Sequence, residues 1–392
     1  MNMKKILPLF LFLVFASFWA CNSKIEVNTS NQVKQGLGLV KVDSIVVDFM
    51  EGIRLLDYDP ERELILGYNR RTGDYIEFNL NGEIVHQVNR TGEGPNGHGR
   101  NTLQVNYMGN GKVGVAAIGR YYIYDEDWQV ERKIDFEFLG SYVLNNSSFY
   151  FLGNPQGKKT DHPYLTIVDI GLGFEKEEDL KKPHFTHLNT ETGAMNKYHQ
   201  LPDSSVYVQT DVLYDQLLAP KVSYNYEQQV LDVVHTLEPV IYRYNLRQAI
   251  PELISVTPFE YDNPHALKGI PFDQYSPFSR SPVSTISLNQ IILAAHSFED
   301  KHLIVYRERH PRADVMNKNE TDMEKIKEYL SITPDRWAYV VENGVRITKD
   351  FAYPSPGIAL QIGKGRFLSS RYVDEEVERE TQLFYIYELQ LE

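Results

Sequence analysis

The stretch 90–100, RTGEGPNGHGR, contains the residues whose types and spacing most clearly suggest chemistry. Its glycines follow a Gly-x-Gly-x-x-Gly spacing from Gly92 to Gly97, which is typical of a dinucleotide-binding turn. Gly94 and Gly99, separated by four residues and followed by Arg100-Asn101, give a near match to a phosphate-binding loop. In both motifs the glycines let backbone amides approach phosphate oxygens at a helix N-terminus.

The surrounding sequence argues against both motifs. Pro95 lies inside the turn, and the chain continues as HGRNTLQVNY, which predicts a strand instead of a helix. Arg100-Asn101 also replaces the lysine and the hydroxyl residue that contact phosphate and magnesium in a phosphate loop. The glycines therefore predict a sharp backbone turn, and Glu93, His98 and Arg100 remain as candidates for contact with a ligand.

Other reactive groups do not form a recognisable site. His184 and His187 have a usable helical spacing, but no third metal ligand accompanies them. The acidic run at 374–380 is typical of a solvated hairpin tip, with calcium binding as the alternative. No serine lies in a Gly-x-Ser-x-Gly elbow. We therefore predict no cofactor and no resident metal.

Internal repetition shows which elements must position the candidate residues. A pair of strands with a Tyr/Ile/Phe core recurs in six copies, at 64–80, 113–127, 149–169, 231–246, 291–308 and 366–389. Further strands precede and follow most copies, and no β-α alternation is present. The pattern predicts an all-β fold, a six-bladed β-propeller, with a seven-bladed propeller or a sandwich as alternatives.

Closure of the ring and two helical insertions follow from shorter segments. SIVVDF at 44–49 is expected to pair with LFYIYELQ at 383–390 and remove a free sheet edge. Thr321-x-x-Glu324 predicts a capping box before an apolar helix face, and DVLYDQLLA at 211–219 is a shorter helix candidate.

The repeat gathers basic side chains at one end of the ring. The loop between the second and third strands of a blade lies at the same end as the loops between blades. The predicted residues of this channel mouth are Arg70, Arg71, Glu93, His98, Arg100, Arg120, His235, Arg280, His296 and Arg371. Arginines in this arrangement can bind a small carboxylate, sulfate or phosphate. The alternative is that they join neighbouring blades through ion pairs.

The N-terminus predicts export and lipidation. Lys4 and Lys5 precede an uncharged apolar run at 6–19, which is too short to span a membrane comfortably. Ala20 then precedes Cys21, the only cysteine, as in a bacterial lipobox, although Trp19 is unusually bulky for that motif. We predict a signal peptide at 1–20, a lipid on Cys21, a tether at 21–40 and the propeller at 41–392.

Charge and flanking residues limit the partners and the compartment. The chain has a formal net charge of −13, and removal of the signal peptide makes it more acidic, which argues against nucleic acid. The lipid would join the protein to a membrane. Asn22-Ser23-Lys24 lacks the acids that often follow the lipidated cysteine of surface lipoproteins, which favours the periplasmic face of the outer membrane.

The lipobox, the GEGPNG loop at 92–97 and the aromatic-rich blades together resemble the DUF4221 lipoproteins of Bacteroidetes. That resemblance implies a six-bladed, TolB-like propeller in a bacterial envelope, and it implies no catalytic residues. We therefore favour a non-enzymatic propeller that binds a small anionic ligand or an envelope protein at its channel mouth. The alternative is a hydrolase or lyase that uses a metal in the central channel.

Overall fold

A computed structural model describes most of residues 38–390, all of which belong to one compact unit. Outside the description lie residues 1–37, 101, 118, 136–147, 152–163, 169–179, 215–219, 226–227, 264, 275–287, 315–321, 355–356, 371–380 and 391–392. Within the described ranges, no helix is long and apolar enough to cross a membrane.

The described strands form five four-stranded sheets, one five-stranded sheet and one two-stranded sheet. The first sheet consists of β2 (Arg54–Asp59), β3 (Leu64–Tyr68), β4 (Asp74–Asn79) and β5 (Ile84–Asn89). The second consists of β6 (Thr102–Gly109), β7 (Lys112–Ala117), β8 (Arg120–Tyr124) and β9 (Val130–Asp135). The third consists of β10 (Ser148–Phe151), β11 (Tyr164–Val168), β12 (Phe185–Asn189) and β13 (Met195–Tyr198).

The remaining sheets follow in chain order. The fourth consists of β15 (Lys221–Asn225), β16 (Val230–Val234), β17 (Val240–Asn245) and β18 (Glu252–Pro258). The fifth consists of β20 (Ile291–Phe298), β21 (Lys301–Arg307), β22 (Arg336–Glu342), β23 (Val345–Arg346) and β24 (Phe351–Ala352). The sixth consists of β25 (Ile358–Gly363), β26 (Arg366–Ser370), β27 (Gln382–Gln390) and β1 (Gly38–Val47).

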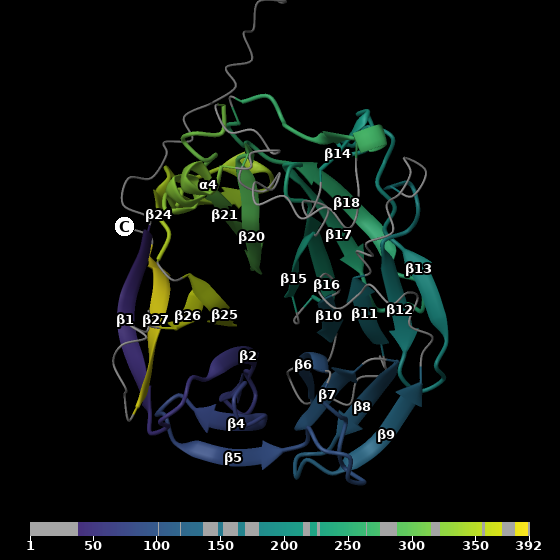
Figure 1. Cartoon of the computed structure of the whole chain (residues 1–392). Helices are drawn as coiled ribbons and strands as arrows, with labels where there is room; N and C mark the ends of the chain where they lie inside the picture. The colour runs from purple at the N-terminus through teal and green to yellow at the C-terminus, as the bar shows by residue number, and fades with distance from the viewer. Residues whose placement is uncertain are drawn as a thin grey trace, which may run out of the picture. The chain divides into compact units, whose positions relative to one another are not determined.

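These sheets are arranged around a common centre as a β-propeller (Figure 1). The first strands of neighbouring sheets contact one another there, as β2 does with β6 and β25, β6 with β10, and β15 with β20. Each sheet is therefore covered on both faces. Strand β3 shows the consequence, since Leu64, Ile65, Leu66 and Gly67 are all buried in spite of their alternating directions.

The predicted closure of the ring is confirmed. Strand β1 pairs antiparallel with β27, with Ser44 opposite Tyr385 and Ile45 opposite Phe384. Ile45 and Phe384 are buried in the core between the sixth and first sheets. Strand β27 is thereby paired on both sides, with β26 and with β1.

The repeat alignment is right for four copies and wrong for two. The first, second, fourth and sixth copies span the second and third strands of their sheets, for example β3 and β4. The third and fifth copies instead span the first and second strands, β10 with β11 and β20 with β21. The reason is that long connections, at 169–184 and 308–335, separate the second and third strands in these two sheets.

The helix predictions need two corrections. Helix α4 (Met323–Leu330) begins at Asp322, whose carboxylate accepts hydrogen bonds from the amides of Glu324 and Lys325, and not at Thr321, which lies outside the described residues. The other candidate contains strand β14 (Val212–Leu213), which pairs with β19 (Ile270–Pro271) just before the 3-10 helix η3 (Phe272–Gln274). A distant strand partner therefore overrides the local helical pattern there.

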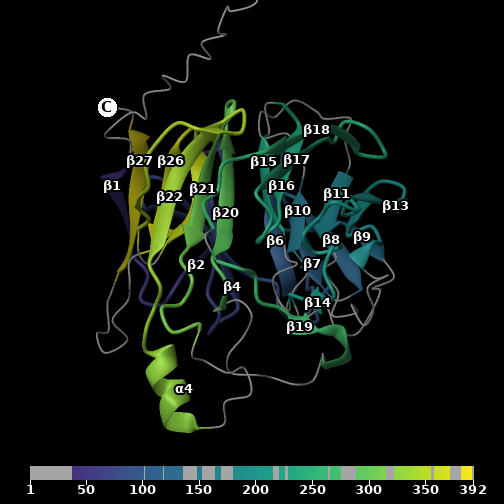
Figure 2. The same cartoon turned by 90° about the horizontal axis from the view of Figure 1, so that it is seen from above.

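Several loops between strands lie together at one end of the propeller. Strand direction alternates within each sheet, so the loops β3–β4, β7–β8 and β21–β22 lie at the same end as the connections between sheets. The β21–β22 connection carries α4, which projects beyond the sheets (Figure 2). We call this the α4 end.

Candidate functional site

A cavity of about 370 Å³ opens where the chain passes from the first sheet to the second. The β5–β6 connection and the β7–β8 hairpin line it, with His98, Gly99, Arg100, Ala117, Gly119, Arg120 and Tyr122. Both segments belong to the α4 end. The cavity volume lies within the range usual for small-molecule sites.

The glycine-rich loop is built by backbone contacts, as its composition predicted. A side chain at Gly97 would place its Cβ atom 2.0 Å from the Gly92 carbonyl oxygen, so only glycine fits. The His98 amide donates to the Arg90 carbonyl at 2.9 Å, and the Tyr124 hydroxyl donates to the Asn96 carbonyl at 3.0 Å. The loop is thus fixed against the second sheet, and it leads into strand β6 and not into a helix.

His98 forms the inner wall of the cavity. Its Nε2 lies 3.0 Å from the Tyr75 hydroxyl and its Nδ1 lies 3.2 Å from Thr102 Oγ1. Burial lowers the pKa of His98 to about 4. The imidazole is therefore neutral at pH 7 and contributes shape and hydrogen bonding instead of charge.

Arg100 and Arg120 supply positive charge to the same cavity. Arg100 is exposed, and no ion pair joins it to a residue in the described part of the chain. The Arg120 side chain is 43% exposed and forms an ion pair with Asp135. The hydrogen bond to Asp135 raises the pKa of Arg120 above its usual value. The Lys133 ammonium lies 5.5 Å from the ring centroid of Tyr122, which lines the cavity, and so adds a third cation beside this wall.

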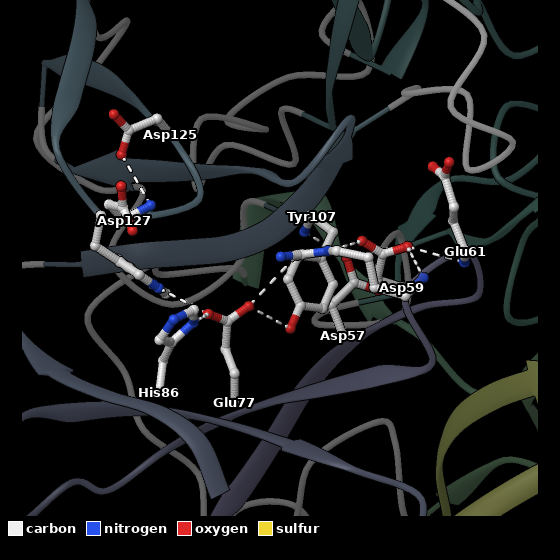
Figure 3. Close-up of polar contacts among 10 residues, drawn as sticks. Asp57, Asp59, Glu61, Glu77, His86, Tyr107, Asp125 and Asp127 are labelled. Atoms are coloured by element: carbon white, nitrogen blue, oxygen red, sulfur yellow. Dashed lines mark hydrogen bonds and ion pairs between the residues drawn. The ribbon is translucent and has the colours of Figure 1, made fainter.

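A buried carboxylate, Glu77, stands behind this wall. It is 1% exposed and accepts hydrogen bonds from Trp128 Nε1 at 2.9 Å and from the Tyr107 hydroxyl at 2.8 Å. His86 Nδ1 lies 2.9 Å from Glu77 Oε2, and Arg62 forms an ion pair with Oε1 at 3.4 Å (Figure 3). Strands of the first and second sheets are joined through this one side chain.

The Glu77 cluster positions the cavity wall through stacked rings. The Tyr75 ring, whose hydroxyl meets His98, stacks on Trp128 with centroids 4.9 Å apart. Sequence reasoning missed Glu77, although an acid inside the apolar strand DYIEFN was a usable signal for a buried, paired carboxylate.

Three other predicted residues of the channel mouth, Arg70, Arg71 and Glu93, do not line the cavity. Arg70 and Arg71 lie exposed on the β3–β4 turn, where Arg71 forms an ion pair with Glu51. Glu93 is exposed on the glycine-rich loop and does not line the cavity. Arg280, Arg371 and Cys21 lie outside the described residues.

Two predicted positions need correction. His296 lies inside the first strand β20, against Phe367 with ring centroids 5.3 Å apart, because the fifth copy was aligned one strand early. His235 does follow the second strand of its sheet, but it is fully buried, and its Nε2 lies 2.8 Å from His199 Nε2. Packing between the third and fourth sheets therefore occupies His235.

No group of three or more His, Cys, Asp or Glu side chains is placed to hold a metal ion within the described residues. His184 Nε2 lies 3.0 Å from the Leu180 carbonyl, and His187 Nδ1 lies 3.2 Å from Thr166 Oγ1. These two histidines thus have different protein partners. The acidic run at 374–380 lies outside the described residues.

Comparisons with known proteins bear on the fold. No protein-family model matches the sequence, and a search of curated proteins gives no match. A crystal structure of a DUF4221 family member from Bacteroides vulgatus is similar with a TM-score of 0.57 and 12% identity, over 92% of this chain and 100% of that chain. A Bacteroides fragilis protein assigned as exported is similar with a TM-score of 0.48 and 10% identity, over 92% and 96% of the two chains. The chain therefore shares the β-propeller fold of a DUF4221 family member, as the resemblance implied.

Proposed function

We propose that this protein binds a small anionic ligand in the cavity between the β5–β6 connection and the β7–β8 hairpin. The observation that carries the proposal is the convergence of Arg100 and Arg120 on one cavity of about 370 Å³, beside the neutral imidazole of His98. Arg100 is exposed and forms no ion pair within the described residues, so its guanidinium group is available to an anion in this cavity.

The chemistry of the wall defines the ligand class. Two guanidinium groups can hold a carboxylate, sulfate or phosphate through paired N–H donors. His98 is neutral, and because Tyr75 and Thr102 hold its two ring nitrogens, it shapes the wall without adding charge. Asp135 already pairs with Arg120, so the ligand must compete with an internal carboxylate.

Isothermal titration with inorganic phosphate, sulfate and citrate tests this proposal on the purified full-length chain at matched ionic strength. We expect saturable binding of at least one anion, weakened by about tenfold or more in Arg120→Gln and in Arg100→Gln. Arg70→Gln is the matched control, since Arg70 is exposed nearby but does not line the cavity. Absence of saturable binding, or equal weakening by Arg70→Gln, contradicts the proposal.

We also propose a six-bladed ring anchored by a lipid on Cys21, with the five-stranded sheet as a full blade beside the five four-stranded sheets. The lipobox-like end of the apolar run supports the anchor, and the residues after Cys21 support the periplasmic face of the outer membrane. Cys21→Ala should abolish labelling by a radioactive fatty acid and release the protein from the membrane fraction. Labelling that persists in this variant would rule out the anchor.

One observation favours a second candidate, catalysis in the central channel by a hydrolase or lyase. Asp57 lies on the inner strand β2, and burial raises its pKa to about 7, which suits an acid–base group. Its carboxylate accepts hydrogen bonds from the amides of Tyr58 at 2.9 Å and Tyr107 at 2.8 Å. Elemental analysis for bound metal, with an ester and lactone panel assayed on wild type and Asp57→Asn, tests this candidate.

A further inference from the structure

Strand β18, the outer strand of the fourth sheet, has an unpaired edge that carries apolar side chains. It pairs with β17 and with no other described strand. Leu253, Ile254 and Val256 in this strand, and Ile250 before it, are each between 46% and 61% exposed. Folded proteins usually protect such an edge with charged side chains, because its free N–H and C=O groups can pair with another strand.

The exposed apolar residues continue onto the outer strands of the two neighbouring sheets. Before β18, the Asn196 side chain donates to the Ala249 carbonyl at 3.1 Å, which places Met195 of β13 alongside. After β18, the Glu260 amide donates to the Gly344 carbonyl at 3.3 Å, next to Val345 of β23. We call this surface the β18 edge, and its exposed apolar residues are Met195, Ile250, Leu253, Ile254, Val256 and Val345.

The outer strands of the neighbouring sheets are too short to cover β18. Strand β18 has seven residues, whereas β13 has four and β23 and β24 have two each. All five residues from Glu252 to Val256 are exposed. Since side chains alternate along a strand, apolar groups are open to solvent on both sides of β18.

Other outer strands in the ring carry charges where β18 carries none. Strand β9, with the sequence VERKID, has two acids and two bases, and β1 has Lys41 and Asp43. Strand β5 also exposes Val85, but His86 and Gln87 follow it and bind acids of β4. In β18 the one charged residue is Glu252, at the first position. The β18 edge thus lacks the charges that keep an edge unpaired.

We propose that the β18 edge is a dimer interface, in which β18 pairs antiparallel with β18 of a second copy of this chain about a two-fold axis at Ser255. A two-fold interface must be complementary to itself, and an added strand satisfies the free backbone groups of the edge. In this register Leu253 lies opposite Thr257 and Ile254 lies opposite Val256 of the second copy. Glu252 lies opposite Pro258, so no like charges face each other.

The same pairing would be unfavourable for β9. An axis at its centre sets Arg132 opposite Lys133 of the second copy, and like charges directly opposite destabilise a strand pair. Self-complementarity is therefore a property of the β18 sequence and not of every outer strand. The bulge at Ile254 concerns the ladder with β17, and both copies carry it at the same distance from the axis.

Sedimentation velocity over about 1 to 100 µM protein tests the dimer on the full-length chain with Cys21→Ala, which cannot carry the lipid. We expect a monomer–dimer equilibrium. Ile254→Lys should raise its Kd by about tenfold or more, because it places two ammonium groups close to the axis. Val85→Lys is the matched control, since Val85 is an exposed apolar residue of an outer strand in the first sheet. A chain that sediments as a monomer throughout would leave the edge to a different protein and overturns the proposal, as does an equal effect of Val85→Lys.

A cross-link tests the position of the axis. Cys21 is the only cysteine, so the full-length chain with Cys21→Ala and Ser255→Cys has one thiol. Directly opposite residues of an antiparallel pair have Cα atoms about 4.5–5.5 Å apart, within reach of a disulfide. Exchange with oxidised glutathione should therefore convert two thiols of Ser255→Cys into one disulfide and yield a covalent dimer.

Thr257→Cys in the same Cys21→Ala chain is the control for the cross-link. Its two thiols would lie four residues apart along the paired strands, about 13 Å, which is too far for a disulfide. A dimer that fails to cross-link through Ser255→Cys, or that cross-links equally through Thr257→Cys, contradicts the proposed pairing. Circular dichroism confirms that the variants compared are folded.

Discussion

The Glu77 cluster and the cavity of Arg100 and Arg120 lie at the same junction between the first and second sheets, but their charged side chains differ in burial and in the number of partners. Glu77 is buried, and four side chains contact it: Arg62 from the β2–β3 turn, His86 from β5, Tyr107 from β6 and Trp128 from the turn after β8. In the cavity the guanidinium groups are exposed, and the carboxylate that meets Arg120, that of Asp135, is itself 72% exposed. A saturated buried charge stabilises the junction, whereas cations open to solvent remain available to a ligand.

A second buried carboxylate with several polar partners lies elsewhere in the ring. Asp232, 1% exposed, is paired with Arg243 and lies 2.8 Å from His302 Nε2 in the next sheet. Both acids are contacted by an arginine and a histidine, and each joins two sheets: Asp232 through His302, and Glu77 through Tyr107 and Trp128. The comparison predicts that changes in such clusters alter stability, and that changes in the cavity alter binding.

The largest effect should come from Glu77→Gln. The amide keeps one acceptor oxygen but places an NH₂ group against donors, and it leaves Arg62 without its second carboxylate partner. Removing one member of a buried charge cluster costs about 3–5 kcal/mol of unfolding free energy. Urea denaturation measures the loss, with the exposed Glu93→Gln as control. A loss below about 1 kcal/mol would show that the Glu77 cluster does not stabilise this junction.

A smaller effect should appear in the pH dependence of stability. The pKa of His98 is about 4 in the folded protein and 6.5 in the unfolded chain, so the unfolded state binds a proton first as pH falls. The stability from neutral His98 is complete above pH 6.5 and is lost towards pH 4, with about 2 kcal/mol lost at pH 5. Urea denaturation from pH 7.5 to 5 should show a shallower decline in His98→Gln than in wild type. Parallel profiles would show that His98 is not held neutral by the cavity wall.

The smallest effect should come from Asp135→Asn, which removes the internal competitor of the ligand. Because both side chains of the Asp135–Arg120 pair are exposed, the unfolding free energy should change very little. Anion affinity in the cavity should rise by about threefold to tenfold, since Arg120 is released for the ligand. Isothermal titration measures the anion affinity, and urea denaturation measures the unfolding free energy. A large loss of stability with unchanged affinity would show that Arg120 stabilises the fold and does not bind the ligand.

Much of the fold could be predicted because its signals are local. Alternating apolar residues bounded by turn residues located β3, β4, β7 and β8, and the turn chemistry of 90–100 predicted a crossover into β6. Of the predicted channel-mouth residues, His98, Arg100 and Arg120 line one cavity, and its role in binding stays a prediction. Their convergence depends on the tight β7–β8 hairpin and on the glycine-rich connection at 90–100, whose backbone contacts fix its path.

By itself, the sequence determined the β-propeller, its closure by β1 against β27 and the bend of the glycine-rich loop, because strand periodicity and glycine geometry act over a few residues. Only the tertiary structure decided the partners of the charged and titratable groups. His235 is buried in the core, His296 lies within strand β20, and Glu77 has four polar partners. One physical reason is that a long insertion changes which strand of a sheet a sequence pattern belongs to, and the pattern itself does not show this. The other is that the role of a charged side chain depends on the groups that packing places within a few ångströms of it.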